Sequence, residues 1–282
     1  MSNFLEEAAR RIEASGGILY SIAESNGLTV RKYDSRLGSA CRNSYSVAKS
    51  FAVAAVGLLY DEGKIDTDER IVDIFSDELP AGMDERWQTM TLHHVLKHAC
   101  GFKTGYLDID AVDSNSFGTD DYLRYLFDTR LCYSPGEGYS YSDAAYYIVS
   151  RVITKRSGCK LDDFLWQRLF YPLGFREVAW SRCPKGYPIG ATGLYIYTED
   201  MVKLGELYMC DGVYRGQRIL SKEWVSIVKD REYEFHKICG GRGYVKGGAF
   251  GQMLAFFPDA QRAIAWHSYN GADILEWVGE NI

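Results

Sequence analysis

The feature that most constrains the fold is a pair of strand hairpins at opposite ends of the chain. Near the N-terminus, Asn26-Gly27 separates two strand-like runs at 18–23 and 28–33. Asn-Gly is the strongest short-range hairpin signal, because both residues tolerate a positive φ. Near the C-terminus, the runs 252–257 and 262–268 flank a second short turn. Because strands so distant in sequence have to pair, we expect one mainly antiparallel sheet built from both chain ends.

The segment between the hairpins is predicted to be mostly helical. Apolar residues recur at helical spacing from Ser46 to Glu62, and Gly63 stands where a glycine ends a helix. A first helix is predicted through Ile12 at the N-terminus. Further helices are predicted over 91–97, 120–128 with Thr119 as N-cap, 144–155, 161–170, 198–210 and 221–229.

This order of elements predicts the domain organisation. We expect a mixed α/β fold in a single domain over 1–282, with a central sheet flanked by helices. The sheet region comprises 1–59 and 175–282, and a mostly helical lobe at roughly 60–174 is inserted in it. The chain is 46% apolar and 25% charged, which are ordinary values for a globular protein. A chain of this length can bury a core without disulfides or a metal.

Charge and hydropathy exclude several classes of partner. The net charge is −6 with no long run of one sign, so nothing favours a nucleic acid or an anionic membrane. No stretch approaches the roughly 18 apolar residues of a membrane span. The N-terminus is acidic at Glu6 and Glu7, where a signal peptide would be basic. The seven scattered cysteines form no Cys-x-x-Cys and are expected to be reduced core thiols. These features predict a cytoplasmic protein.

The first candidate for chemistry is the Ser-x-x-Lys sequence of Ser46 and Lys49. The same spacing recurs at Ser157/Lys160 and Ser226/Lys229, so the motif alone carries little weight. Only Ser46 opens a long apolar helix, where residues three apart share a face. A buried lysine can serve as the base for a serine nucleophile, and an N–H at the positive helix end can stabilise an oxyanion. The alternative is a capping serine beside a lysine that reaches solvent.

Two further segments could complete an active site. Residues 134–143 form a turn-rich loop before an apolar helix, and a tyrosine on a rigid loop near a lysine can shuttle a proton. Residues 246–251 combine a lysine, which suits a substrate carboxylate, with glycines that let a substrate approach an edge strand. The alternatives are a tyrosine-rich surface loop and a flexible, glycine-rich hairpin entry.

The order Ser-x-x-Lys, Tyr-Ser-Asp and Lys-Gly-Gly resembles the penicillin-recognising serine hydrolases. More narrowly, it resembles the branch of class C β-lactamases, D-Ala-D-Ala peptidases and esterases. The resemblance covers most of the chain and includes 46–66, 90–102 with His98 and Gly101 in place, 135–142, 171–175, 193–205, 218–221 and 247–258. It implies a β-lactamase/transpeptidase-like fold and a hydrolase without a cofactor.

The resemblance also implies a set of site residues. Ser46 is the nucleophile, Lys49 its base partner, and Tyr141 the tyrosine that handles the proton of Ser46 or of the leaving group. The backbone N–H groups of Ser46 and Ala249 form the oxyanion hole. The substrate-binding positions are Asp143, Lys246, Gly247 and Gly248, of which the last three occupy the family's Lys-Thr-Gly position.

Three departures from the family pattern matter. Asp143 stands where the family usually has Asn, and an ionised carboxylate cannot donate to a substrate amide and would weaken Lys49 as a base. Gly247 replaces the usual Thr and removes a hydroxyl that helps to hold a carboxylate. Both changes favour ester hydrolysis over recognition of β-lactams or D-Ala-D-Ala. The chain also ends at Ile282 with no long C-terminal helix, through truncation or absence of the family's last helix.

Three histidines, His93, His94 and His98, could suggest a metal site. His94 and His98 share a helix face, but there is no His-Glu-x-x-His and no obvious third ligand. We therefore expect no metal and a structural hydrogen bond from His98.

The sequence as a whole predicts a serine hydrolase that forms an acyl-enzyme with small esters or amides. Its partner is a small-molecule ester, amide or peptide substrate. The alternative, motivated by Asp143, is a catalytically weakened, penicillin-binding-like protein that binds or senses a ligand and acylates slowly or not at all. A purely structural domain would require three motifs to line up by accident.

Overall fold

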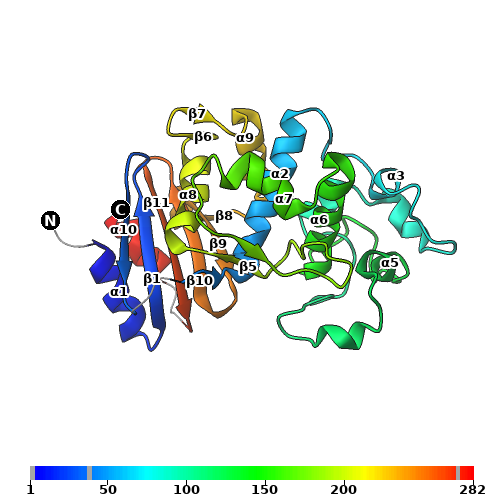
Figure 1. Ribbon diagram of the computed structural model, residues 1–282, viewed down its shortest axis with the longest axis horizontal. Helices are drawn as coiled ribbons and strands as arrows, with labels where there is room; N and C mark the ends of the chain where they lie inside the picture. Colours follow the sequence, from blue (N-terminus) through cyan, green and yellow to red (C-terminus); the bar gives the residue numbers. More distant parts are fainter. Residues whose placement is uncertain (1–3, 37–39, 271–273) are drawn as a thin grey trace. The chain divides into compact units, whose positions relative to one another are not determined.

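The computed structural model describes residues 4–36, 40–270 and 274–282 and divides into two compact units. The sheet unit comprises Met1–Phe51, Arg168–Ala179 and Leu194–Ile282, and the helical unit comprises Ala52–Gln167 and Trp180–Gly193. Helix α2 (Ala48–Asp61) runs from the first unit into the second (Figure 1). The first segment of the helical unit, Ala52–Gln167, is therefore shifted toward the N-terminus relative to the lobe predicted at roughly 60–174, and the unit also includes Trp180–Gly193.

A six-stranded antiparallel sheet forms the sheet unit, in the order β2-β1-β11-β10-β9-β8 (Figure 1). Its strands are β1 (Ile18–Ser25), β2 (Val30–Asp34), β8 (His236–Ile238), β9 (Gly243–Gly248), β10 (Gln252–Phe257) and β11 (Arg262–Tyr269). The antiparallel pairing of β1 with β11 joins the two ends of the chain, with Ile18 opposite Tyr269 and Ser25 opposite Ala263. The structure thus confirms the sheet predicted from the two hairpins.

Helices cover both faces of this sheet: α1 (Phe4–Ala14), α8 (Thr198–Met209) and α10 (Leu275–Asn281) (Figure 1). α1 and α10 pack over one apolar core that includes Leu5, Ile12 and Trp266. α8 packs against β1, β10 and β11 on the other face, and Gly205 is the residue at which it meets the strands. The sequence analysis missed α10, because a short terminal helix carries little periodicity. Residues 1–3, part of the predicted N-terminal segment, lie outside the described residues.

The helical unit is organised around one buried helix. Its helices are α3 (Ile71–Ile74), α4 (Leu92–Leu96), α5 (Tyr122–Phe127), α6 (Asp143–Ser157) and α7 (Leu161–Leu165), the last continued by a π-helical turn (Trp166–Phe170). Every residue of α6 from Asp143 to Ile153 is buried, and Gly158 ends the helix with φ 75°. Thr119 was the wrong N-cap for α5. The helix starts at Tyr122, so it is Asp121 whose carboxylate accepts the Arg124 N–H at 3.1 Å.

The remaining elements of the fold are short. β3 (Arg42–Asn43) pairs with β5 (Leu194–Ile196), and β6 (Val213–Tyr214) pairs with β7 (Gln217–Arg218). The other elements are β4 (Ala179–Trp180) and α9 (Lys222–Arg231), for which Ser221 is the N-cap. The pairing of β3 with β5 matters for function, because the two residues of β3 lead into the segment that carries Ser46.

The cysteines agree only partly with the expectation of reduced core thiols. All seven cysteines are free thiols. Cys100 and Cys183 are buried, but Cys132 and Cys159 are exposed because they lie in surface loops, so the expectation of core thiols was wrong for these two. No helix in the described part of the chain has both the length and the apolar character needed to cross a membrane.

Candidate active site

Ser46 lies on a 3-10 turn (Tyr45–Val47) that leads directly into α2. Immediately before the turn, Ser44 donates its N–H and its hydroxyl to the Leu194 carbonyl, at 2.8 and 2.9 Å, which anchors the turn to β5. Lys49 Nζ donates to Ser46 Oγ at 3.0 Å. Lys49 is fully buried, whereas Ser46 is half-buried. The structure thus places the predicted nucleophile and its base partner in hydrogen-bond contact.

The two other Ser-x-x-Lys sequences do not form such pairs. Ser157 Oγ donates to the Cys159 carbonyl at 3.0 Å and helps to close the end of α6. Ser226 Oγ donates to an Asp230 carboxylate oxygen at 3.2 Å. In the described hydrogen bonds, neither serine contacts the lysine three residues later, so the arrangement at Ser46 is not a general result of the spacing.

Strand β9 passes so close to the turn that carries Ser46 that only glycine fits at position 248. A Cβ atom there would lie 2.6 Å from the Ser44 carbonyl oxygen and 3.3 Å from the Ser46 nitrogen. A Cβ atom at Gly247 would make only ordinary van der Waals contacts, of which the shortest is 3.7 Å to Met253 Sδ. The close approach at Gly248 sets the chain that leads into Ala249 against the Ser46 N–H. An oxyanion hole with two backbone donors requires such a juxtaposition.

Gln252 holds the backbone of Ala249 in place. Its Nε2 donates to the Ala249 carbonyl at 3.1 Å and to the Ser268 carbonyl at 2.7 Å, and its Oε1 accepts the Ser268 N–H at 3.1 Å. The side chain is buried. Gln252 was not among the residues predicted for the site. The available signal was a lone polar residue at the start of an otherwise apolar strand.

Two aromatic residues with left-handed backbones flank the predicted oxyanion donors. Tyr45, which precedes Ser46, has φ 48°, and Phe250, which follows Ala249, has φ 61°. Such conformations are strained for bulky residues, cost about 1–3 kcal/mol each, and cluster at functional sites. The two rings pack edge to face with their centroids 5.0 Å apart. This contact ties the segment before Ser46 to the segment after Ala249.

Lys246 lies on β9 and is paired with a buried acid. Because side chains alternate along a strand, Lys246 and Gly248 share a face. Lys246 Nζ forms an ion pair with the Glu234 carboxylate, and both side chains are buried. β8 pairs with 243–245 and stops before Lys246. Among the described strands, none pairs with 246–248 on that side of β9, so the strand residues of the motif have the edge position that was expected for them.

Tyr141 belongs to the helical unit, where His98 holds its loop. The rings of Tyr141 and His98 lie 4.3 Å apart. His98 Nδ1 accepts the Ser142 N–H at 3.4 Å, and its carbonyl accepts the Ser140 N–H at 2.8 Å. The predicted structural hydrogen bond of His98 is thus present. His98 itself has φ 53°, and its contacts on both sides of Tyr141 keep this loop in one conformation.

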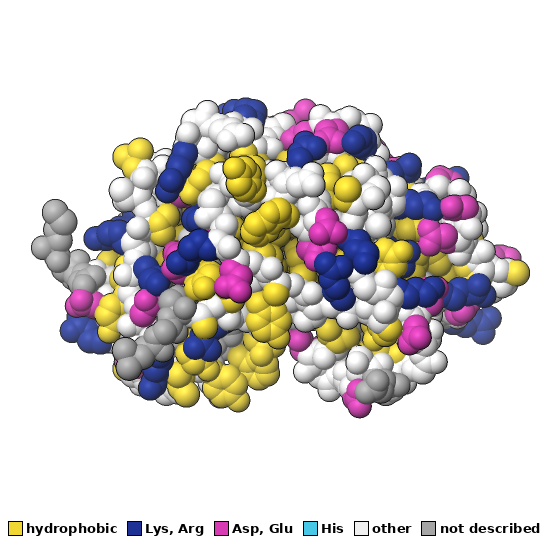
Figure 2. Space-filling view, viewed as in Figure 1, with side chains coloured by type: hydrophobic (Ala, Val, Ile, Leu, Met, Phe, Trp, Pro, Cys, Tyr) yellow, Lys and Arg dark blue, Asp and Glu magenta, His cyan; other side chains and the backbone are white. Residues whose placement is uncertain are grey.

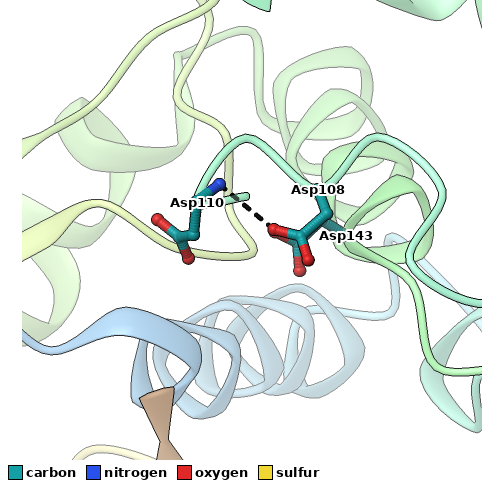
Figure 3. A group of neighbouring side chains, drawn as sticks. All are labelled: Asp108, Asp110 and Asp143. Atoms are coloured by element: carbon teal, nitrogen blue, oxygen red, sulfur yellow. Dashed lines mark hydrogen bonds between the residues drawn. The ribbon is translucent and has the colours of Figure 1, made fainter. Parts of the chain in front are cut away.

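Asp143, the first residue of α6, belongs to a cluster of three carboxylates with Asp108 and Asp110 (Figure 3). One oxygen from each lies within 4.8 Å of the others. The Asp110 N–H donates to Asp108 Oδ1 at 3.1 Å, and Thr192 Oγ1 donates to Asp110 Oδ2 at 2.6 Å. Carboxylate oxygens are the ligands that hard divalent cations prefer, so these three residues are the ones that could hold such an ion. Clusters of this kind are common without an ion, and we assign no metal to it.

The predicted site residues thus fall into two groups. The sheet unit brings together Ser46, Lys49 and the Gly247-Gly248-Ala249 segment, with Lys246 on the same strand. The helical unit contributes Tyr141 and Asp143. Within the first group, a serine hydroxyl contacts a buried amine, and the backbone of Gly248 passes close to the Ser46 nitrogen. That arrangement can activate an oxygen nucleophile and stabilise the oxyanion formed by its attack.

Comparisons with known proteins match most of the chain. A family model described as "Beta-lactamase" matches residues 43–271. The chain is 26% identical to Penicillin-binding protein 4 of Amycolatopsis lactamdurans over 219 residues, which are 67% of this chain and 56% of that protein. It is 27% identical to esterase EstB of Burkholderia gladioli over 143 residues, which are 47% of this chain and 36% of that protein. The chain therefore matches about a third to just over half of the length of these two relatives.

The solved structures show the same fold. The crystal structure of a D-stereospecific amidohydrolase from Streptomyces sp. matches with a TM-score of 0.72 and 14% sequence identity, and the match covers 97% of each chain. At this identity the likeness concerns the fold alone. It agrees with the mixed α/β architecture described above.

Proposed function

Since the chain belongs to the Beta-lactamase family of hydrolases, we propose that it is a serine hydrolase that forms an acyl-enzyme with small esters or amides. The observation that carries this proposal is the 3.0 Å hydrogen bond between buried Lys49 and Ser46 Oγ. Relatives named as an esterase and as a penicillin-binding protein support the reaction class but not one substrate.

In the proposed mechanism, Ser46 Oγ attacks the substrate carbonyl while its proton passes to Lys49 Nζ. The oxyanion is stabilised by the N–H groups of Ser46 and Ala249. Collapse of the tetrahedral intermediate breaks the bond to the leaving group, which receives a proton through Tyr141. Water then attacks the acyl-enzyme, and Ser46 regains its proton as the acid product leaves.

We propose that esters are better substrates of this protein than β-lactams or peptides. Asp143 offers only acceptor oxygens when ionised, so it cannot donate to an amide carbonyl as Asn would. Gly247 offers no hydroxyl for a substrate carboxylate. Lys246 can contribute positive potential near the site, although Glu234 already compensates part of its charge. An ester needs neither of the two missing donors.

Labelling with a fluorophosphonate tests the nucleophile. We expect the wild-type protein to gain one covalent adduct, because the phosphorus is attacked by an activated serine and fluoride leaves. Ser46→Ala should gain none, whereas Ser157→Ala, a serine with the same motif spacing, should be labelled like wild type. The measurement is intact-protein mass after incubation. A folded wild-type protein that stays unlabelled, or an adduct that survives in Ser46→Ala, would contradict the proposal.

The second candidate function is a binding or sensing protein that acylates slowly or not at all. Asp143 favours it, because this acid occupies a position that the resemblance assigns to substrate binding, and it belongs to a cluster of carboxylates. Asp143→Asn is expected to raise the rate of acylation by a β-lactam by roughly tenfold, since it restores an amide donor. Asp108→Asn is the matched control, because it removes the same charge from the same cluster. The measurement is the rate of adduct formation by mass. Unchanged or slower acylation in Asp143→Asn would refute this role of the acid.

A further inference from the structure

A pocket of about 230 Å³ opens in the sheet unit beside the nucleophile turn. Its lining includes Tyr45, which precedes Ser46, and Phe250 and Gln252, which follow Ala249. Tyr20, Tyr195 and Tyr269 also line it. Figure 2 shows hydrophobic side chains gathered at the end of the sheet unit where β10 begins and β11 ends. The pocket is therefore placed where part of a substrate bound to Ser46 would extend.

Exposed aromatic rings shape this pocket. Tyr195, Phe250 and Tyr269 are 39%, 43% and 44% exposed. The rings of Phe250 and Tyr269 stack at 5.4 Å, and Tyr45 packs edge to face on Phe250. Grouped exposed aromatic side chains around a concavity mark ligand sites in soluble proteins. The aromatic wall is suited to a flat apolar group.

One cation lines the same pocket. The Arg42 guanidinium lies over the Tyr20 ring at 3.7 Å from its centroid, and Arg42 is half-buried. No carboxylate among the residues described by the structure forms an ion pair with it. His267 beside it is buried and stays neutral, because burial and the charge of Arg42 lower its pKa to about 3. A half-buried guanidinium held flat in this way is available for an anionic group.

Lys246, which the Lys-Gly-Gly motif offers for a substrate anion, differs from Arg42 because it has a carboxylate partner. Lys246 is paired with buried Glu234, so its charge is already compensated. Cys41, which also lines the pocket, is a poor nucleophile, because burial, with the charge of Glu177 beside it, raises its thiol pKa to about 11. The pocket thus combines a cation and aromatic rings without a reactive group, which suits it for binding.

We propose that this pocket is a specificity subsite for an aryl carboxylate, with the ring against the wall formed by Tyr45, Phe250 and Tyr269 and the carboxylate on Arg42. The volume is below the roughly 300–1,000 Å³ of sites that enclose a drug-sized ligand, so it takes one ring and its acid group. This inference rests on the proposed function for the identity of the bound molecule as part of the substrate. It adds a substrate class, and Arg42 as the residue that selects it.

Binding to Ser46→Ala tests the subsite separately from catalysis. Phenylacetate is titrated against this variant by calorimetry, with the uncharged phenylacetamide as the matched ligand. We expect phenylacetate to bind at least tenfold more tightly, because a charged hydrogen bond to Arg42 is absent for the amide. Adding Arg42→Gln should abolish the preference, and Arg42→Lys should keep part of it. Adding Arg31→Gln, where the arginine is paired with Glu24 in the same unit, should leave it unchanged.

Each outcome of this experiment decides one of the two proposals. Equal binding of both ligands, no binding of either, or a preference that survives Arg42→Gln would overturn the subsite. If fluorophosphonate labels Ser46 and phenylacetate does not bind, only the subsite is wrong. If phenylacetate binds through Arg42 and Ser46 is not labelled, the pocket is a ligand site and the hydrolase proposal is wrong. Thermal unfolding is measured for every variant to check that the variant is folded.

Steady-state kinetics of the Arg42→Gln variant with Ser46 intact, compared with the wild type, give a second readout. For an aryl ester that carries a carboxylate, Arg42→Gln is expected to raise KM by roughly tenfold with kcat little changed, because the lost interaction is made equally before and during the reaction. Hydrolysis of uncharged 4-nitrophenyl acetate should be unaffected. A fall in kcat for both esters would show a structural role for Arg42 and contradict the subsite.

Discussion

Replacing Lys49 by methionine is expected to lower kcat for hydrolysis of 4-nitrophenyl acetate by roughly three orders of magnitude. Lys49 Nζ is the donor on Ser46 Oγ at 3.0 Å and is fully buried, so no water can replace it as a base in the same place. Methionine retains an unbranched chain of similar length, and burial of a polar amine costs free energy in the folded state. We therefore expect the variant to fold, with a melting temperature at or above that of the wild type.

The control for this variant is Lys160→Met. It removes the lysine of the second Ser-x-x-Lys sequence, whose Ser157 is bonded to the Cys159 carbonyl instead. Its kcat should equal that of the wild type. Steady-state rates and thermal unfolding of both variants check the prediction. A Lys49→Met enzyme that keeps more than about a tenth of the wild-type rate would mean that Lys49 is not the base, given the usual size of general base catalysis.

Gly248→Ala is expected to lower kcat/KM by roughly 100-fold or more, the size of effect that the loss of one oxyanion donor has. The added methyl would lie 2.6 Å from the Ser44 carbonyl oxygen, so backbone atoms have to move. The movement separates β9 from the turn that carries Ser46 and misplaces the Ser46 and Ala249 N–H groups. Fluorophosphonate labelling of Ser46 should slow in parallel, because it also forms charge on an oxygen in that hole.

The neighbouring glycine provides the matched control for this variant. Gly247→Ala adds the same methyl to the same strand, but the nearest atom is Met253 Sδ at 3.7 Å. We expect the rate at which fluorophosphonate labels Ser46 to stay within about twofold of the wild type and the melting temperature to stay the same, because no atom has to move. Equal slowing of this labelling in the two variants would show that the close approach at Gly248 does not position the donors.

Local sequence patterns predicted most of the sheet and the long helices. Asn26-Gly27 placed the first hairpin, and Gly27 indeed has φ 82°. Gly63 and Gly158 end their helices with φ 65° and 75°. These predictions succeeded because a positive φ and helical periodicity depend on the conformational preferences of a few neighbouring residues.

Elements that depend on distant partners were missed. β8 is three residues long and exists because 236–238 finds β9 beside it. α10 packs on the same core as α1, at the other end of the chain. Neither segment has enough residues to show a period of its own. Burial of the cysteines likewise depends on which loops face solvent, and composition does not record this.

The sequence by itself determined that Ser46 and Lys49 share one face at the start of a helix, because they lie three residues apart. Only the tertiary structure decided what surrounds that pair. Gly248 differs from Gly247 because Ser44 lies against one and not the other, and Gln252 acts on Ala249 through its own bonds to Ser268. Arg42, Tyr45 and Phe250 meet around one pocket from positions some 200 residues apart. Such contacts are set by the folding of the whole sheet unit, so no short stretch of sequence can encode them.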